Sequence, residues 1–183
     1  MKTLNEILSD KLTDKNTIHS YGDVYTELFE TKRETAKNVL EIGVCFGGSI
    51  LAWYEYFKNA KIYGMDIMYN QHVSNLPNDR INIILQDAYD SHVYNAMSKL
   101  KYDLIIDDGP HTLESMKFTA SKYSNLLTDD GILVIEDVQD EKWIPEIKES
   151  FPEDLRDMVS VYDLRSVKDR YDDILVVLDK RTQ

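Results

Sequence analysis

The chain has 183 residues, 43% of them hydrophobic, and a formal net charge of -12. This length predicts one domain with a sizeable core. The acidic balance excludes general binding to nucleic acid or to an anionic membrane, because both depend on clustered Lys and Arg. The single Cys45 excludes an intramolecular disulfide and a cysteine zinc cluster, and it indicates a reducing compartment. We see no apolar leader segment and no apolar run near the roughly 20 residues of a membrane span, so we expect a cytoplasmic protein.

The first part of the chain predicts helix rather than strand. Two charged, amphipathic stretches, TLNEILSDK and GDVYTELFETKRE, indicate one or two helices within residues 1–36. We therefore expect a single domain over 1–183, in which residues 1–36 form a helical cap on a core of residues 37–183.

Short apolar runs then alternate with segments of helical length and composition. This alternation predicts a parallel sheet with helices on both faces, and the continuous apolar runs suit strands that are buried on both faces. The last two runs have no long helix between them, so we expect an antiparallel hairpin at one edge, where a second subunit could pair. The predicted strands are 38–43, 61–66, 81–87, 102–108, 131–137, 158–164 and 173–179, and the predicted helices between the first five are 49–59, 91–100 and 112–127.

Each of the first five predicted strands ends in acid. Ligands of open α/β sheets bind outside the carboxyl ends of the strands, so these acids are expected to meet at one rim. Any single member could instead be a helix N-cap or a turn residue. The acids are Glu41, Asp66, Asp87, the pair Asp107 and Asp108, and the pair Glu136 and Asp137.

The first half of this rim suits a nucleoside. The stretch EIGVCFGGS (41–49) is a Gly-rich turn between a strand and a helix, where a ligand can approach the backbone closely, although alone it could be a tight turn. The usual G-x-G-x-x-G pattern and a triphosphate-binding P-loop are both absent. Asp66 lies about 20 residues on, where an acid can accept hydrogen bonds from ribose hydroxyls, and Asp87 could take an adenine amino group.

The second half of the rim suits a hard cation. Carboxylates gathered at the ends of two neighbouring strands repel one another, and Mg²⁺, Ca²⁺ or Mn²⁺ would remove that conflict. Strand side chains alternate, so one acid of each pair should turn away from the rim, and the sequence does not settle whether 136 or 137 does so. His111 follows Asp108 across a Gly-Pro turn and could accept a hydroxyl proton, or could be a surface histidine. For His72 and His92 we favour an exposed position.

The motifs EIGVCFGGS, YGMD (63–66) and QDA (86–88) resemble those of class I S-adenosylmethionine-dependent methyltransferases. The resemblance implies a Rossmann-like fold with a seven-stranded, mostly parallel sheet, helices on both faces and a C-terminal antiparallel hairpin. Cys45 departs from the commonest glycine pattern of this class. The resemblance also implies a cofactor site in which Glu41, Gly43, Gly47 and Ser49 surround the methionine part, Asp66 binds the ribose, and Asp87 and Ala88 lie at the adenine.

The stretch DDGPH, followed by IED, is similar to the metal-dependent sugar O-methyltransferases of the macrocin and mycinamicin type. That resemblance implies that Asp108, Glu136 and Asp137 bind the metal and that His111 is the catalytic base, with Asp107 in a structural role. The segment TDKNTIHSYGDVYTELF (13–29) looks like the same group, which would place His19, Tyr21 and Tyr25 over the cofactor or active site. We count Tyr21 among the expected cofactor-binding residues, although both tyrosines could simply pack in a helix.

Together these patterns predict an O-methyltransferase that uses S-adenosylmethionine and Mg²⁺ (or Mn²⁺). The expected acceptor is a small molecule with a sugar hydroxyl, and we expect no nucleic acid or membrane partner and, more weakly, a homo-oligomer. A catechol or another vicinal diol would suit the same metal. A non-catalytic S-adenosylmethionine-binding protein is the alternative of another class. An iron hydroxylase is disfavoured because no two-histidine, one-carboxylate pattern is evident.

Overall fold

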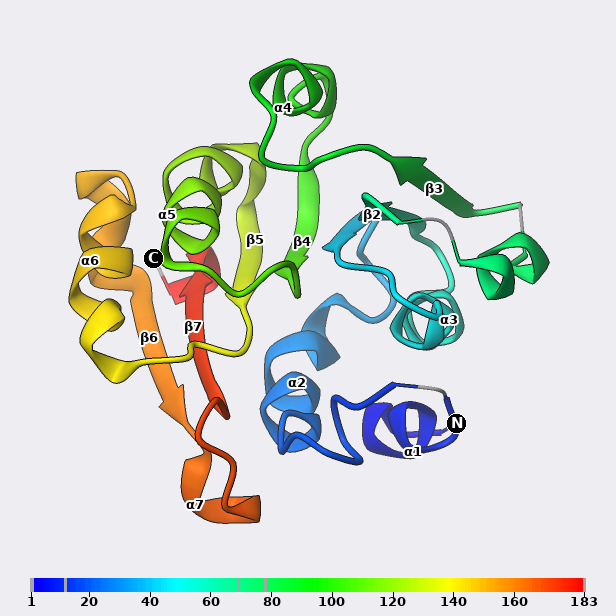
Figure 1. Cartoon of the computed structure of the whole chain (residues 1–183). Coiled ribbons are helices and arrows are strands. Elements are labelled where there is room, and N and C mark those ends of the chain that lie inside the picture. The colour runs from blue at the N-terminus through cyan, green and yellow to red at the C-terminus, as the bar shows by residue number, and fades with distance from the viewer. Residues whose placement is uncertain (1, 12, 69, 78, 183) are drawn as a thin grey trace.

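A computed structural model describes residues 2–11, 13–68, 70–77 and 79–182. The strands form one seven-stranded sheet in the order β3-β2-β1-β4-β5-β7-β6. Strands β1 to β5 are parallel, while β7 runs antiparallel to both β5 and β6 (Figure 1). The predicted fold class, including the C-terminal antiparallel hairpin, is thus confirmed. The strands are β1 (Asn38–Ile42), β2 (Lys61–Asp66), β3 (Ile81–Leu85), β4 (Tyr102–Asp107), β5 (Leu127–Ile135), β6 (Val159–Asp163) and β7 (Ile174–Asp179).

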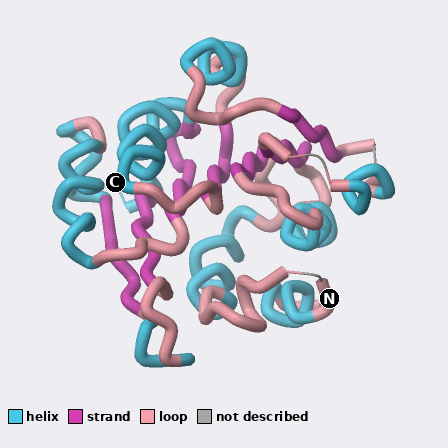
Figure 2. Tube along the Cα trace, viewed as in Figure 1, coloured by secondary structure: helices cyan, strands magenta, loops and turns pink. Residues whose placement is uncertain are grey.

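Helices lie on both faces of the sheet, and Figure 2 shows them alternating with the strands along the trace. In the described part of the chain, no helix is long and apolar enough to cross a membrane. The helices are α1 (Leu4–Ser9), α2 (Gly22–Phe29), α3 (Gly48–Tyr56), α4 (Ser91–Met97), α5 (Leu113–Lys122), α6 (Ile144–Ser150) and α7 (Arg165–Lys168). Two of them, α1 and α2, lie in the stretch where one or two helices were expected.

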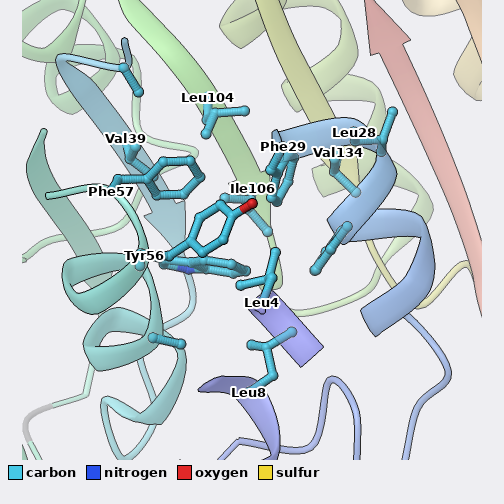
Figure 3. Packing of buried hydrophobic residues seen from close by; sticks show 14 of the residues in the cluster. Leu4, Leu8, Leu28, Phe29, Val39, Tyr56, Phe57, Leu104, Ile106 and Val134 are labelled. Carbon is cyan, nitrogen blue, oxygen red and sulfur yellow. The ribbon is translucent and has the colours of Figure 1, made fainter. Parts of the chain in front are cut away.

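The core is divided by the sheet into two apolar layers. Alternate residues of a strand point to opposite faces, so Leu104 and Ile106 of β4 pack in one layer and Ile105 packs in the other. The first layer contains residues of α1, α2 and α3, and Figure 3 shows Leu4 and Phe29 near Ile106. The second contains residues of α4, α5 and α6. Burial on both faces explains why the strands are almost continuously apolar.

The register of the central strands aligns their carboxyl ends. Ile42 of β1 pairs with Asp107 of β4, and Asp107 pairs with Ile135 of β5. The pairing continues one residue further, because the Asp108 amide donates to the Ile42 carbonyl over 2.8 Å and the Glu136 amide donates to the Asp107 carbonyl over 3.0 Å. The residues that follow these strands therefore lie side by side, as the predicted rim requires.

Strand β6 is one edge of the sheet, opposite β3. Val161 in the middle of β6 is 37% exposed. The expectation that this edge pairs with a second subunit stays a prediction.

Candidate active site

A cavity of about 920 Å³ opens at the carboxyl ends of β1, β2 and β4. Its size is that of a site for a small-molecule ligand, and its place is the one expected for an open α/β sheet. The N-terminal segment, the β1–α3 loop, the β3–α4 loop and the turn after β4 all contribute to its walls. The lining residues include Asp14, Ile18, Gly43, Cys45, Ser49, Asp66, Asp87, Ala88, Asp108 and His111.

The β1–α3 loop has an unusual backbone that Asp66 holds in place. Gly43 and Gly47 have φ angles of 88° and 80°, and Cys45 has a φ of 48°, a left-handed conformation that is uncommon for a residue with a side chain. Asp66 Oδ2 accepts hydrogen bonds from the amides of Val44 and Cys45 over 2.9 and 3.0 Å. Although partial burial acts to raise the pKa of Asp66, these and other backbone donors lower it below its usual value. Asp66 therefore stays ionised while it shapes the loop and faces the cavity.

Most of the residues expected at the cofactor are brought together at this cavity. Gly43, Ser49, Asp66, Asp87 and Ala88 line it, while Glu41, Gly47 and Tyr21 do not belong to its wall. Glu41 is fully buried beneath the loop and accepts a hydrogen bond from Ser49 Oγ over 2.8 Å. Tyr21 is also fully buried, and its hydroxyl donates to Asp137.

Asp108 and His111 line the same cavity, and Asp137 lies next to His111 outside the cavity wall. His111 Nε2 lies 3.7 Å from Asp108 Oδ1 and 3.6 Å from Asp137 Oδ2. One potential ligand atom from each residue lies within 4.8 Å of the others. Both His111 and Asp137 have positive φ angles, 52° and 54°, and strained backbone of this kind is concentrated at functional sites. The turn Gly109–Pro110 thus returns the imidazole to the acids.

Glu136 faces a buried lysine instead of that three-residue group. Lys15 Nζ donates to both carboxylate oxygens of Glu136, over 2.8 and 2.7 Å, and to Asp108 Oδ2 over 2.7 Å. The same ammonium lies 3.4 Å from Glu41 Oε1. Tyr25 donates a further hydrogen bond to Glu136. The structure therefore joins Asp108 and Glu136 through Lys15.

A second group of buried polar side chains lies next to Asp137. His19 Nδ1 lies 2.6 Å from Asp173 Oδ1 and 3.4 Å from Asp137 Oδ1. His19, Asp172 and Asp173 are all buried, and they also form a set of three potential ligand atoms. His19, Tyr21 and Tyr25 thus contact buried carboxylates, and none of the three lines the cavity wall.

The two adjacent acids of β4 have separate surroundings. Asp107 is buried, accepts a hydrogen bond from Tyr89 over 2.6 Å and another from Thr119, and lies outside the cavity wall. These contacts agree with the structural role expected for Asp107. Asp108 is part of the cavity wall. As expected, His72 and His92 are exposed.

Several acids of the rim have pKa values above the usual range. Burial raises the pKa of Glu41 to about 7 even though Lys15 opposes the shift. Burial also raises the pKa values of Glu136 and Asp137, and the charge of Asp108 raises them further. This donor set of carboxylates and one imidazole suits a hard divalent ion, which would favour the ionised forms. The residues present therefore fit the expected metal.

Sequence reasoning missed Lys15 and Asp173. Lys15 is the third residue of the quoted TDK motif, but lysines are usually exposed, and nothing local indicates a partner 93 or 121 residues away. Asp173 was read only as the start of the last strand. The spacing Lys15, His19, Tyr21 and Tyr25 was a usable signal, since it places four hydrogen-bond donors on one short segment.

A seven-stranded sheet in this order, with a ligand cavity beside a Gly-rich β1–α3 loop, is the fold of a class I methyltransferase, as the resemblance predicted. A family model described as a methyltransferase domain matches residues 40–138. The chain therefore belongs to this methyltransferase family.

Curated relatives are named as sugar O-methyltransferases. The chain is 30% identical over 156 residues to 8-demethyl-8-alpha-L-rhamnosyl tetracenomycin-C 2'-O-methyltransferase of Streptomyces olivaceus, which covers 80% of this chain and 40% of that protein. It is 31% identical over 150 residues to mycinamicin VI 2''-O-methyltransferase of Micromonospora griseorubida, covering 76% and 37%. The chain thus spans less than half the length of these relatives.

A solved structure has the same fold. MycE methyltransferase from the mycinamycin biosynthetic pathway, in complex with Mg, SAH and mycinamycin VI, superposes with a TM-score of 0.77. The identity is 21%, and the alignment covers 97% of this chain and 54% of that one. This likeness shows the fold.

Proposed function

We propose that the protein transfers a methyl group from S-adenosylmethionine to a hydroxyl of a sugar or glycoside, with Mg²⁺ (or Mn²⁺) and with His111 as the base. The proposal rests on one observation above all: Asp108 and His111, which form a group of potential metal ligands with Asp137, line the cavity that the Gly-rich loop also lines. The names of the curated relatives support the acceptor class.

The cofactor half of the cavity is assigned from its lining residues. Asp66 and Asp87 offer carboxylates to the ribose and adenine, and Ala88 adds an apolar contact. Gly43 and Ser49 lie where the methionine part would bind, with Glu41 supporting Ser49 from below. The sulfonium of the bound cofactor would supply an electrophilic methyl group. We assign Tyr21 an indirect role, in which its hydrogen bond positions Asp137.

The acceptor half is assigned to the acids and the imidazole. Asp108, Glu136 and Asp137 would hold the metal, which would lower the pKa of an acceptor hydroxyl and stabilise its oxyanion. His111 takes the hydroxyl proton, and its Nε2 atom is already directed toward Asp108 and Asp137. Because His111 lines the cavity beside these carboxylates, the acceptor oxygen and the methyl group can be aligned there.

Replacing His111 with Ala tests the base. We expect S-adenosylmethionine binding, measured by calorimetry, to stay within about twofold, and methyl transfer to fall by about 10²–10⁴-fold, the usual contribution of a positioned base. The assay uses a panel of glycosides and vicinal diols, with Mg²⁺ or with excess EDTA. His92→Ala is the matched control, because His92 is an exposed histidine outside the cavity wall.

Each other result has a defined meaning. If the protein binds no S-adenosylmethionine, the proposed function is wrong. Methylation of catechols but of no glycoside favours the diol alternative. Tight cofactor binding without methylation of any acceptor, under any divalent metal, favours a non-catalytic binding protein.

A further inference from the structure

Lys15 is a buried ammonium group at the centre of the acidic rim. Its side chain is 1% exposed, and Glu41 and Glu136 beside it are 0% and 2% exposed. Its Nζ atom lies 2.7 Å from Asp108 Oδ2, 2.7 Å from Glu136 Oε2 and 3.4 Å from Glu41 Oε1. Nζ donates hydrogen bonds to three carboxylate oxygens, which uses all three protons of an ammonium group. The group is therefore a fixed positive charge.

Lys15 holds oxygens that a divalent ion would need. Both oxygens of Glu136 and Oδ2 of Asp108 accept its protons, which leaves Oδ1 of Asp108 directed toward His111. We propose that Lys15 is a tethered cation that competes with the divalent metal for Asp108 and Glu136. The inference rests on the proposed function, since it concerns the metal assigned there.

The carboxyl groups of the rim explain what a buried cation contributes to this site. Glu41, Asp108 and Glu136 surround a single ammonium, and Asp137 lies beside them, so four carboxyl groups share one nearby cation. Lys15 makes the buried acids tolerable before a metal binds, because an uncompensated buried charge is costly. The carboxyl groups still offer several oxygen donors to a divalent ion, which would favour their ionised forms. The fixed ammonium repels that ion and occupies part of its donor set, so it weakens metal binding and keeps the metal exchangeable.

The backbone around Lys15 is anchored, so the competition involves its side chain. The Tyr21 amide donates to the Lys15 carbonyl over 3.0 Å, and the Ile18 and His19 amides donate to the Asp14 carbonyl. Lys168 Nζ also donates to the carbonyls of Asn16 and His19. Four rotatable bonds let the lysine head move from its oxygens, after which these backbone contacts alone hold the turn and it opens more often.

Lys15→Met in the full chain tests the competition, because Met keeps the apolar stem and removes the charge. Calorimetric titration with Mn²⁺, and then with Mg²⁺, should give this variant a Kd at least about tenfold lower than that of the wild type. The Kd should fall because the substitution removes a repelling charge a few ångströms from the ion. Lys15→Arg retains a repelling positive charge, so its metal affinity should stay below that of Lys15→Met. Lys32→Met is the matched control, since Lys32 is a buried lysine paired with Asp130 away from this site. The metal affinity of the Lys32→Met variant should equal that of the wild type.

An unchanged or weaker affinity in Lys15→Met overturns the inference and would make Lys15 a residue that only positions the acids. If the wild type binds no divalent ion, a new site in Lys15→Met supports the competition, and no site in either protein overturns it. The proposed function fails by a different result, namely methyl transfer that is absent or indifferent to EDTA in the wild type.

Hydrogen exchange on the wild type gives a second measurement that needs no variant. Competition predicts that saturating Mg²⁺ increases exchange in the segment 13–21, because the lysine that fastens this segment to the rim loses its partners. Decreased or unchanged exchange there would contradict the competition even if Lys15→Met fails to fold.

Discussion

At the scale of single residues, the acids of this rim differ through their surroundings. Asp107 is satisfied by Tyr89 and Thr119 in the core, while the neighbouring Asp108 meets Lys15 and faces His111. Alternation along β4 separates the two, and that alternation was readable from sequence. The hydrogen-bond donors to each acid were not readable from the sequence, because they come from distant segments.

Glu41 should make stability depend on pH. Its folded-state pKa is raised from 4.5 to about 7, so the folded protein binds the extra proton more tightly than the unfolded chain. The resulting stabilisation is fully present below pH 4.5 and is lost as pH rises through about 7. At 1.36 kcal/mol per pH unit, this interval limits the loss to about 3 kcal/mol. Urea denaturation across this range should show a flatter pH profile for Glu41→Gln.

Glu55→Gln is the control for this pH profile. Glu55 makes a partly exposed surface ion pair with Lys11, so the variant should follow the wild type between pH 4.5 and 7. A Glu41→Gln profile that is parallel to the wild type would mean that Glu41 is ionised throughout, and that the ammonium of Lys15 outweighs burial.

At the scale of elements, the end of β1 has no room for a side chain. A Cβ atom on Gly43 would lie 1.8 Å from the Asp108 carbonyl oxygen, and the φ of Gly43 is 88°. The Asp108 backbone cannot withdraw easily, because its amide is bonded to the Ile42 carbonyl. We therefore expect Gly43→Ala to lower the free energy of unfolding by more than about 3 kcal/mol, since a clash adds to the strain of positive φ.

Gly47→Ala separates these two effects. Gly47 also has a positive φ, 80°, but a Cβ there would first meet Leu76 Cδ1 at 3.3 Å, a flexible side-chain atom. Its cost should be that of backbone strain, about 1–3 kcal/mol. Equal losses in the two variants, measured by denaturant unfolding, would show that close packing of β1 against the Asp108 backbone contributes little.

The sheet was predictable because its strands are short apolar runs that end in polar residues. All seven predicted runs correspond to observed strands. The start of β5 was placed at 131 but lies at Leu127, because Leu127 pairs with Tyr102 across an irregular register that no local pattern encodes. Helix α6 was not predicted, since its seven residues give little periodicity and its packing on α5 supplies the stability.

At the scale of the whole molecule, the N-terminal segment completes the site. Lys15, His19, Tyr21 and Tyr25 contact carboxylates that lie 93 to 154 residues later in the chain. The strand-end acids were predictable because parallel strands bring their carboxyl ends to one rim. The resemblance placed His19, Tyr21 and Tyr25 near the active site, but it did not give Lys15 or the carboxylate partners of these residues, because those contacts depend on how α1 and α2 pack on the finished sheet.

Divalent metal should stabilise the whole fold, since an ion that binds the folded chain alone shifts the unfolding equilibrium. At a Mg²⁺ concentration one hundred times the Kd, the gain is about 2.7 kcal/mol, which corresponds to a rise in Tm of about 5–10 °C for a chain of this size. EDTA should reverse the rise, and Asp108→Asn should abolish it.

The control for this experiment follows from the net charge of -12. Any salt screens the self-repulsion of so acidic a chain, so NaCl at matched ionic strength must be run beside Mg²⁺. NaCl should raise Tm by a small amount that is equal in the wild type and in Asp108→Asn. If NaCl reproduces the full Mg²⁺ effect, the ion acts on the surface as a whole and the acids of the rim do not form a metal site.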